Sequence, residues 1–502
     1  MKGKVFLIGA GPGDPGLLTL KGRDRLEKAD VVVYDALVNA RLLDYAKSGA
    51  ARFYVGKRGH QHAMEQSQIN DLLVRQALRG RQVARLKGGD PFLFGRGGEE
   101  ALFLHDHKIP FEVISGVSSA SGASGYAGIP LTDRNWGSMV TMVTGHEGAG
   151  KALGSVEWSR ISRKSTLVIF MGLERLGEIT ERLMKHLWPK EMPAALIRWG
   201  SLPRQEVLEG TLGDIAARAK DAKMASPVLV VIGRVVALRK KLRWFETKPL
   251  FGKKIVVTRA ADQIREFSTL LEDAGAEVIA VPAIQLQPPK SWAGVDDAIK
   301  RIAGFQWILF TSANGVGAFF KRLRAHNADV RSLQSIRIGA IGAKTAARLE
   351  SYGLNVDVFP SEYRAEALAD VVGAVQGANV LIARAEEARD VLPKTLEARG
   401  ASVTIATVYR TLKARGVASA VKQRLLAGDI DAVTFTSSST VDGFMESLSA
   451  RERRKIFEHA KAAVIGPITA QTLRGYGIRP TIRAKRYTIE SLASAILRYF
   501  SK

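Results

Sequence analysis

Short runs of valine, isoleucine and leucine alternate along the whole chain with longer stretches whose apolar residues recur at helical spacing. Apolar runs that are too short for a helix and lack polar alternation are typical of strands buried on both faces. Strands that alternate with helices predict largely parallel sheets covered by helices, which is an α/β fold. The clearest runs lie at residues 5–8, 31–34, 167–170, 228–232, 255–257 and 380–382.

The chain has 502 residues, which is too long for one hydrophobic core and fits about three or four lobes. After Val236 the sequence becomes basic and loses its periodicity until Gly252. We therefore expect the main boundary there. The expected parts are a first domain over 1–240, a basic linker over 241–252 and a second domain over 253–502.

The second domain contains an internal duplication that is visible in the sequence alone. The repeated segments are 257–260 and 382–385, 310–312 and 435–437, and 341–342 and 465–466. The offset is 125 residues both from Arg259 to Arg384 and from Ser312 to Ser437. A register that holds over this length predicts two similar α/β lobes, and a cleft between lobes is a common place for a small ligand.

The composition excludes several classes of function. The chain has no cysteine, which excludes disulfides, thiolate catalysis and cysteine-based zinc or iron–sulfur sites. No run reaches the ~18 apolar residues of a membrane span, and no signal peptide is visible at the N-terminus. We therefore expect a cytoplasmic protein that does not bind a membrane.

The net charge of +25 predicts a polyanionic partner, either nucleic acid or a small polycarboxylate. The arginines are spread along the chain and are not interleaved with aromatic residues, which disfavours nucleic acid. The densest basic runs, 239–243 and 451–455, are interpreted as a linker and a solvated helix face.

Glycine-rich loops mark the first domain. The segment 9–16 with Asp35 matches a dinucleotide fingerprint, but Pro12 and Pro15 remove amide donors that a pyrophosphate would need. We therefore reject that interpretation. Further loops follow at 87–100 and 115–119, and several such loops indicate close approach of the backbone to a flat, adenosine-bearing cofactor.

About the first 235 residues resemble the tetrapyrrole methylase family, and most closely the uroporphyrinogen-III C-methyltransferases. The resemblance is carried by residues 5–15, 33–38, 56–58, 85–91, 126–132 and 170–172. It implies a two-lobed α/β homodimer that binds S-adenosylmethionine in a cleft. The implied contacts with this cofactor are Pro12, Gly88, Gly89, Asp90, Leu93, Ser118, Ser119, Met171 and Gly200.

Methyl transfer from a sulfonium requires in-line positioning, exclusion of water and acceptance of a proton, and it needs no metal. The resemblance implies that Asp35 is the proton acceptor and that Lys57 is a proton donor or a carboxylate anchor. The residue types alone favour a strand-end turn acid and a surface lysine.

Residues 253–502 resemble the uroporphyrinogen-III synthases. The resemblance is carried by residues 256–259, 310–316, 408–411, 435–438 and 464–470. It implies that one lobe, at about 287–409, is inserted between the two pieces of the other lobe, at about 253–286 and 410–502. The boundary of the duplication and the boundary of the lobes would then differ.

The resemblance to this family implies that Tyr409 is the residue that assists departure of the substrate hydroxyl. Arg259 and Arg384 are candidates to bind substrate carboxylates bidentately. Hydroxyls and free amides at strand ends form natural carboxylate sites, and the residues concerned are Ser312, Thr436, Ser437 and Thr469. Plain helix capping by Ser312, Ser437 and Thr469 explains the same pattern.

The two resemblances together imply one short pathway. The second domain would cyclise hydroxymethylbilane to uroporphyrinogen III with inversion of the last ring. The first would then add two methyl groups and give precorrin-2, on the branch to siroheme and cobalamin. Both substrates carry eight carboxylates, which accounts for the positive charge. The alternatives are an RNA methyltransferase of the same superfamily and a non-catalytic tetrapyrrole-binding module in the second half.

Overall fold

The computed structural model describes residues 2–47, 49–56, 64–145, 156–259, 264–282, 284–360, 365–413 and 416–501. The chain divides into two compact units. The first comprises Met1–Lys254 with the short segments Leu270–Glu277 and Leu497–Lys502, and the second comprises Ile255–Thr269 and Val278–Ile496. No helix within the described ranges is long and apolar enough to cross a membrane.

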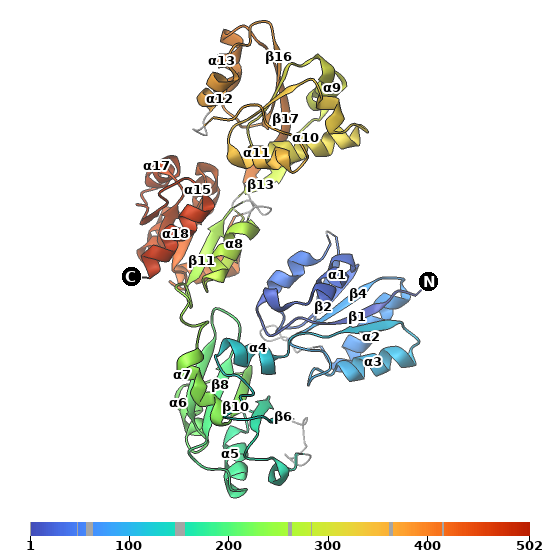
Figure 1. Ribbon diagram of the computed structural model, residues 1–502, viewed down its shortest axis with the longest axis vertical. Coiled ribbons are helices and arrows are strands. Elements are labelled where there is room, and N and C mark those ends of the chain that lie inside the picture. The colour runs from blue at the N-terminus through green and yellow to red at the C-terminus, as the bar shows by residue number, and fades with distance from the viewer. Residues whose placement is uncertain are drawn as a thin grey trace. The chain divides into compact units, whose positions relative to one another are not determined.

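The first unit begins with a parallel sheet in the order β3-β2-β4-β1-β5. Side chains alternate between its faces, so Leu7 packs toward Leu73 and Leu104 while Ile8 packs toward Leu26. The elements are β1 (Val5–Gly9), α1 (Leu20–Lys28), β2 (Val31–Tyr34), β3 (Ala51–Tyr54), α2 (Gln66–Leu78), β4 (Val83–Lys87), α3 (Gly97–Asp106) and β5 (Phe111–Ile114). Figure 1 shows these elements in blue.

A second sheet completes this unit, in the order β6-β7-β10-β8-β9. Only β6 and β7 are parallel, whereas β10 is antiparallel to both β7 and β8, and β8 is antiparallel to β9. The elements are α4 (Ser119–Tyr126), β6 (Val140–Thr144), β7 (Thr166–Phe170), α5 (Leu176–Lys185), β8 (Pro193–Arg198), β9 (Glu206–Thr211), α6 (Ile215–Asp221), β10 (Val228–Ile232) and α7 (Arg239–Leu242).

The expectation of largely parallel strands is therefore wrong for this sheet. Apart from Thr166 at the start of β7, the strands β7 and β10 are apolar because separate core clusters cover both of their faces. An uninterrupted apolar run reports burial on two faces and carries no information about strand direction.

The second unit holds two five-stranded sheets, and the chain passes from one to the other and back. The first sheet has the order β12-β11-β18-β19-β20. Its elements are β11 (Lys254–Thr258), α8 (Ile264–Asp273), β12 (Glu277–Ala280), α14 (Ser419–Leu426), β18 (Ala432–Phe435), α15 (Ser438–Met445), α16 (Ala450–His459), β19 (Lys461–Val464), α17 (Pro467–Gly475), β20 (Ile482–Arg483) and α18 (Ile489–Phe500). In Figure 1 the green β11 therefore shares a lobe with the red C-terminal helices.

The other sheet has the order β13-β17-β16-β14-β15. Its elements are β13 (Ile284–Gln287), α9 (Ala293–Lys300), β14 (Trp307–Phe310), α10 (Ala313–Ala325), β15 (Arg337–Ala340), α11 (Ala343–Glu350), α12 (Ala365–Val372), β16 (Asn379–Ala385), α13 (Val391–Ala398) and β17 (Ser402–Lys413). The sheet thus runs from Ile284 to Lys413, slightly beyond the expected 287–409 at each end.

The duplication is present in the topology of the two sheets. Strands β11, β18 and β19 are neighbours in that order, and their sequence counterparts β16, β14 and β15 are neighbours in the same order. The first repeat therefore supplies β11 to one sheet and β14 and β15 to the other. The second repeat supplies β18 and β19 to the sheet of β11, and β16 to the sheet of β14 and β15. Each lobe is built from parts of both repeats.

The basic run at 239–243 is not a free linker at its start. Arg239 is buried in the first unit, donates to the carbonyl of Ala127 and forms ion pairs with Glu209 and Glu246 at 3.0 and 2.6 Å. A buried guanidinium needs such partners, because leaving its charge unpaired would cost several kcal/mol.

Candidate functional site

A cavity of about 620 Å³ lies in the first unit where β1 and β4 end. Parallel strands bring their carboxyl ends to the same edge of a sheet, and the loops that follow them meet there. The second sheet contributes residues that follow β7 and β8. The lining includes Gly11, Pro12, Asp35, Arg85, Lys87, Gly88, Gly89, Asp90, Leu93, Ser118, Ser119, Met171, Trp199 and Gly200.

One wall of this cavity is bare backbone. Gly89 has a φ of +69°, and its amide donates to the carbonyl of Gly11 at 2.8 Å. A side chain on Gly88 would place its Cβ 2.7 Å from Cβ of Leu37. Asp90 holds the wall in place, because its two carboxylate oxygens accept the amides of Phe92 and Gly116. A flat ligand can approach such a wall closely, which fits an adenosine group.

Four non-glycine residues around the cavity have a left-handed backbone, with φ between +51° and +58°. They are Phe94, Arg96, Met171 and Trp199. This conformation costs roughly 1–3 kcal/mol per residue, and such strain collects at ligand sites. The strain is therefore concentrated on the same cavity as the glycine-rich loops.

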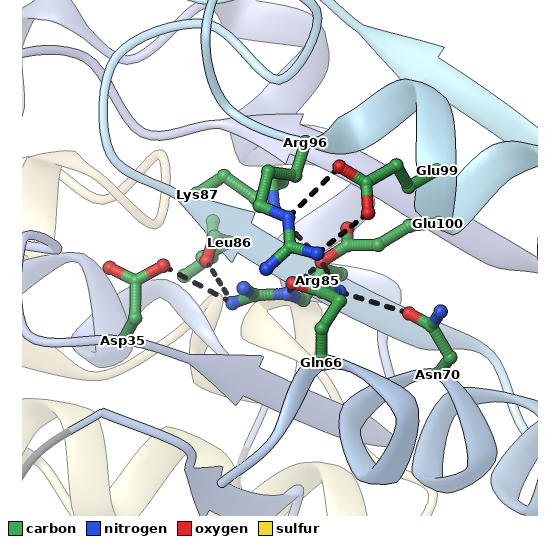
Figure 2. A network of polar contacts seen from close by, with 9 residues as sticks. All are labelled: Asp35, Gln66, Asn70, Arg85, Leu86, Lys87, Arg96, Glu99 and Glu100. Atoms are coloured by element: carbon green, nitrogen blue, oxygen red, sulfur yellow. Dashed lines mark hydrogen bonds and ion pairs between the residues drawn. The ribbon is translucent and has the colours of Figure 1, made fainter. Parts of the chain in front are cut away.

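A buried cluster of charges forms another part of the wall (Figure 2). Arg85 and Lys87 lie two residues apart on β4 and are 3% and 5% exposed. One oxygen of the fully buried Glu100 accepts from Lys87 Nζ at 2.8 Å, from Arg85 Nε at 3.3 Å and from Gln66 Nε2 at 3.1 Å. Arg85 Nη1 also reaches Asp35 Oδ2 at 3.4 Å.

Burial changes the acid–base behaviour of this cluster. Removal from water, together with the neighbouring Arg85 charge, lowers the pKa of Lys87, while Glu100 opposes that shift. The Asp35 carboxylate is held at the cavity edge, where its Oδ1 accepts the amide of Leu37 at 3.1 Å. The cavity thus combines an oriented carboxylate with two fixed cations.

The second unit has a cavity of about 960 Å³ beside α10. Four cations line it, namely Lys321, Arg322, Lys344 and Arg348. Tyr409 and Asn314 also line it, and the Tyr409 hydroxyl lies 3.1 Å from Oγ of Ser312. The cation-rich lining suits an anionic ligand.

Comparison with known proteins identifies both halves of the chain. Residues 4–216 match the family model of tetrapyrrole (corrin/porphyrin) methylases, and residues 265–494 match that of uroporphyrinogen-III synthase HemD. A porphyrin biosynthesis protein HemD of Ruminiclostridium josui is 36% identical across 99% of this chain and 98% of its own. The chain belongs to both families.

Two further similar proteins are a relative that matches 70% of the chain and a solved structure that matches 47% of it. A uroporphyrinogen-III C-methyltransferase of Bacillus subtilis (strain 168) is 37% identical over 70% of this chain and 72% of its own. A crystal structure of uroporphyrin-III C-methyl transferase from Thermus thermophilus, complexed with S-adenyl homocysteine, is 38% identical. It covers 47% of this chain and 100% of that one, with a TM-score of 0.42. The family models and the relative from Ruminiclostridium josui confirm the two enzyme families expected from the sequence, and the four sheets with their helices confirm the α/β fold.

The methylase cavity brings together nearly all the residues expected there. All nine predicted cofactor contacts line it, and so does Asp35. They come from loops that lie far apart in the sequence, and no residue predicted for the synthase is among them. Lys57, the other predicted catalytic residue of the methylase, lies outside the described residues.

The predicted synthase residues are more scattered. Of this set only Tyr409 lines the synthase cavity. Ser312 and Ser437 cap α10 and α15, as the capping alternative predicted. Thr469 is 4% exposed and is not a cap, because α17 begins after Gly466 with Pro467 in its first turn. Thr469 also lines neither of the two cavities described above.

The remaining three synthase candidates differ in how accessible they are. Arg384 is 9% exposed and forms an ion pair with Asp390 at 2.8 Å. Arg259 and Thr436 are half-buried. A bidentate contact from Arg384 to a substrate carboxylate would have to compete with Asp390.

Sequence reasoning missed Arg85, Lys87 and Glu100 as members of the methylase site. The signal for the first two was their spacing, because residues two apart on a strand face the same side. Two cations on one face of a buried strand require a buried counter-charge. Nothing in the sequence separated Glu100 from its exposed neighbour Glu99.

Proposed function

We propose that the chain carries out two consecutive steps of tetrapyrrole synthesis. The synthase half cyclises hydroxymethylbilane to uroporphyrinogen III with inversion of the last ring. The methylase half then transfers two methyl groups from S-adenosylmethionine and yields precorrin-2. The observation that carries the proposal is the convergence of all nine predicted donor contacts and Asp35 on one cavity, in a chain matched by both family models.

S-adenosylmethionine, when bound, supplies an electrophilic methyl group whose transfer breaks a carbon–sulfur bond and leaves the electron pair on sulfur. The glycine wall at 88–89 and the start of α4 hold the adenosine part of the donor. Asp35 accepts the proton that the methylated pyrrole ring loses. Arg85 and Lys87 place positive charge where the carboxylates of the tetrapyrrole enter. The residues that bind the donor are thus distinct from those that handle the proton and the carboxylates.

In the synthase half, Tyr409 donates a hydrogen bond to the departing hydroxyl of hydroxymethylbilane. Ser312 supports this role because its Oγ, which accepts from Gly315 N at 3.0 Å, lies within hydrogen-bond distance of the phenol oxygen. Lys321 and Arg348 bind the substrate carboxylates and hold the linear chain in a cyclic shape, whereas Arg322 and Lys344, which also line the cavity, are paired with Asp296 and Glu266.

Incubation of the purified full chain with hydroxymethylbilane, with and without S-adenosylmethionine, tests both steps in one vessel. Without the donor, uroporphyrinogen III should accumulate, and with the donor a doubly methylated product should replace it. Absorbance and mass identify the products. Accumulation of the uncatalysed isomer I alone would refute the synthase step, and authentic uroporphyrinogen III would then test the methylase step separately.

We further propose that the methylase domain covers residues 1–240 and the synthase domain 253–502, joined by 241–252, and that the methylase domain forms a homodimer. The two family models end at 216 and begin at 265, on either side of this boundary. Light scattering of the full chain measures the oligomeric state, and limited proteolysis of the full chain shows whether it is cut within 241–252. A monomeric full chain would refute the dimer.

A further inference from the structure

Glu100 is the centre of the buried charge cluster, although it is not among the residues that line the methylase cavity. It lies on α3 and is 0% exposed. Its Oε1 accepts from Gln66, Arg85 and Lys87, which all line the cavity. Its Oε2 has no hydrogen-bond partner within the described part of the chain. The three cavity residues are therefore anchored to a single oxygen behind the wall (Figure 2).

Arg85 connects this buried carboxylate to the cavity edge. Its Nε donates to Glu100, and its Nη1 donates to the carbonyl of Leu86 at 2.9 Å and to Asp35 at 3.4 Å. Both carboxylate contacts of Arg85, at 3.3 Å to Glu100 and 3.4 Å to Asp35, are longer than the about 2.7–2.9 Å usual for charged hydrogen bonds. Arg85 thus divides its charge between the two carboxylates and is held tightly by neither.

The cluster joins two buried cations, Arg85 and Lys87, to two carboxylates, Glu100 and Asp35. Glu100 holds both cations, whereas Asp35 contacts Arg85 alone. Without the anion at Glu100, the Arg85 guanidinium would keep Asp35 as its carboxylate partner and turn toward it. An Asp35 carboxylate engaged in this way would no longer be presented to the cavity.

We propose that Glu100 is a positioning residue for methyl transfer, which holds Arg85 and Lys87 against the cavity wall and so keeps the Asp35 carboxylate available to accept a proton. This inference rests on the proposed role of Asp35. Glu100 itself touches neither the donor nor the tetrapyrrole, and it acts through Arg85.

The test compares four full-length proteins in steady-state methylation of uroporphyrinogen III: the wild type, Glu100→Gln, Asp35→Asn and the double variant. Glu100→Gln should lower kcat at least about tenfold, within the range of general base effects. Its KM for S-adenosylmethionine and its affinity for S-adenosylhomocysteine should stay within about twofold, because Glu100 does not line the cavity. The matched control Glu27→Gln, which removes a glutamate paired with Arg23 on the surface, should leave kcat unchanged.

The double variant separates a positioning role from a structural one. If Glu100 acts through Asp35, then Glu100→Gln should lower kcat by less than about twofold once Asp35 is already asparagine. Equal factors in both backgrounds would show independent effects and overturn the inference. If Glu100→Gln keeps the wild-type kcat while Asp35→Asn is inactive, the inference about Glu100 is wrong and the assignment of Asp35 as the base stands. An active Asp35→Asn enzyme would overturn both the inference and the assignment of the base.

Loss of the buried charge could also unfold the methylase, and S-adenosylhomocysteine binding would then be lost. Thermal unfolding and S-adenosylhomocysteine binding of Glu100→Gln therefore accompany the kinetics. If this variant unfolds at the wild-type temperature and binds S-adenosylhomocysteine normally while its kcat stays at least about tenfold low, the positioning role holds. If kcat falls only in proportion to the protein that has lost binding, Glu100 serves stability only and the inference is wrong.

Discussion

The hydroxyl of Tyr409 lies 3.1 Å from Oγ of Ser312, which caps the N-terminus of α10. Tyr409 comes from β17 and Ser312 follows β14, so 97 residues of chain separate the two. The serine oxygen also accepts the amide of Gly315 at 3.0 Å. The phenol is thereby fixed beside the cation-lined cavity of the synthase.

Replacement of Tyr409 by phenylalanine should reduce conversion of hydroxymethylbilane about 100-fold, because a hydrogen-bond donor to the leaving hydroxyl is lost while the ring is retained. Methylation of uroporphyrinogen III by the same protein should be unchanged. Ser312→Ala serves as the comparison, since it removes the cap and should cost about 1 kcal/mol of stability. Wild-type ring closure by Tyr409→Phe would remove this residue from the mechanism.

Alanine at Gly89 should weaken binding of S-adenosylhomocysteine at least about fivefold, because the left-handed backbone disfavours a Cβ and the methyl group enters the donor wall. Gly49 is a matched control. It also has a positive φ, +88°, and a Cβ there would meet no atom within 4 Å. Isothermal titration should therefore show normal affinity for Gly49→Ala, and equal weakening in both variants would mean that strain alone is responsible.

Phe319 tests whether the two units are stable independently. It is fully buried and makes edge contacts with Phe310 and Phe320, with ring centroids 5.6 Å apart in each pair. Phe319→Ala should destabilise the synthase unit by about 3–5 kcal/mol. Ring closure should fail at a lower temperature while methylation keeps its wild-type temperature profile. Loss of both activities at the same temperature would show that the units unfold together.

Asp296 predicts a specific dependence of stability on pH. Hydrogen bonds from Arg322, and then from His326, lower the pKa of Asp296 from 3.8 to about 2. A carboxyl whose pKa is lowered by folding stabilises the folded protein at pH values above its pKa in the unfolded chain. This contribution is lost as the pH falls through the pKa of the folded protein. Asp296→Asn should therefore lower the urea midpoint of the synthase unit at pH 7. The difference from wild type should shrink between pH 3.8 and about 2, and a difference independent of pH would contradict this account.

The sequence predicted the strands well because burial leaves a direct mark on composition. Residues 5–8, 31–34 and 228–232 are apolar and lie within β1, β2 and β10. Strand direction leaves no such mark, and the mostly antiparallel β6-β7-β10-β8-β9 sheet was therefore missed. Direction depends on the connections between strands and on the faces that their helices cover.

The predicted donor contacts meet in one cavity whereas the predicted synthase residues are scattered, and this difference has a physical reason. The methylase loops depend on glycines and prolines whose backbone geometry is tied to local sequence, as at Gly88 and Gly89. The synthase candidates are hydroxyls and arginines, which serve equally as caps, core groups or ion pairs. Thr469 and Arg384 show this, since one is buried and the other is paired with Asp390.

The sequence by itself determined the two enzyme families, the α/β class, the duplication and the donor loops, because each depends on residues close together or at a constant spacing. Only the tertiary structure decided which strands of the two repeats share a sheet, and which acidic residue pairs with Arg85 and Lys87. Glu99 and Glu100 are adjacent in the chain, yet the fold buries one among three donors and leaves the other in solvent. Burial and charge pairing are properties of packed elements, and no local pattern encodes them.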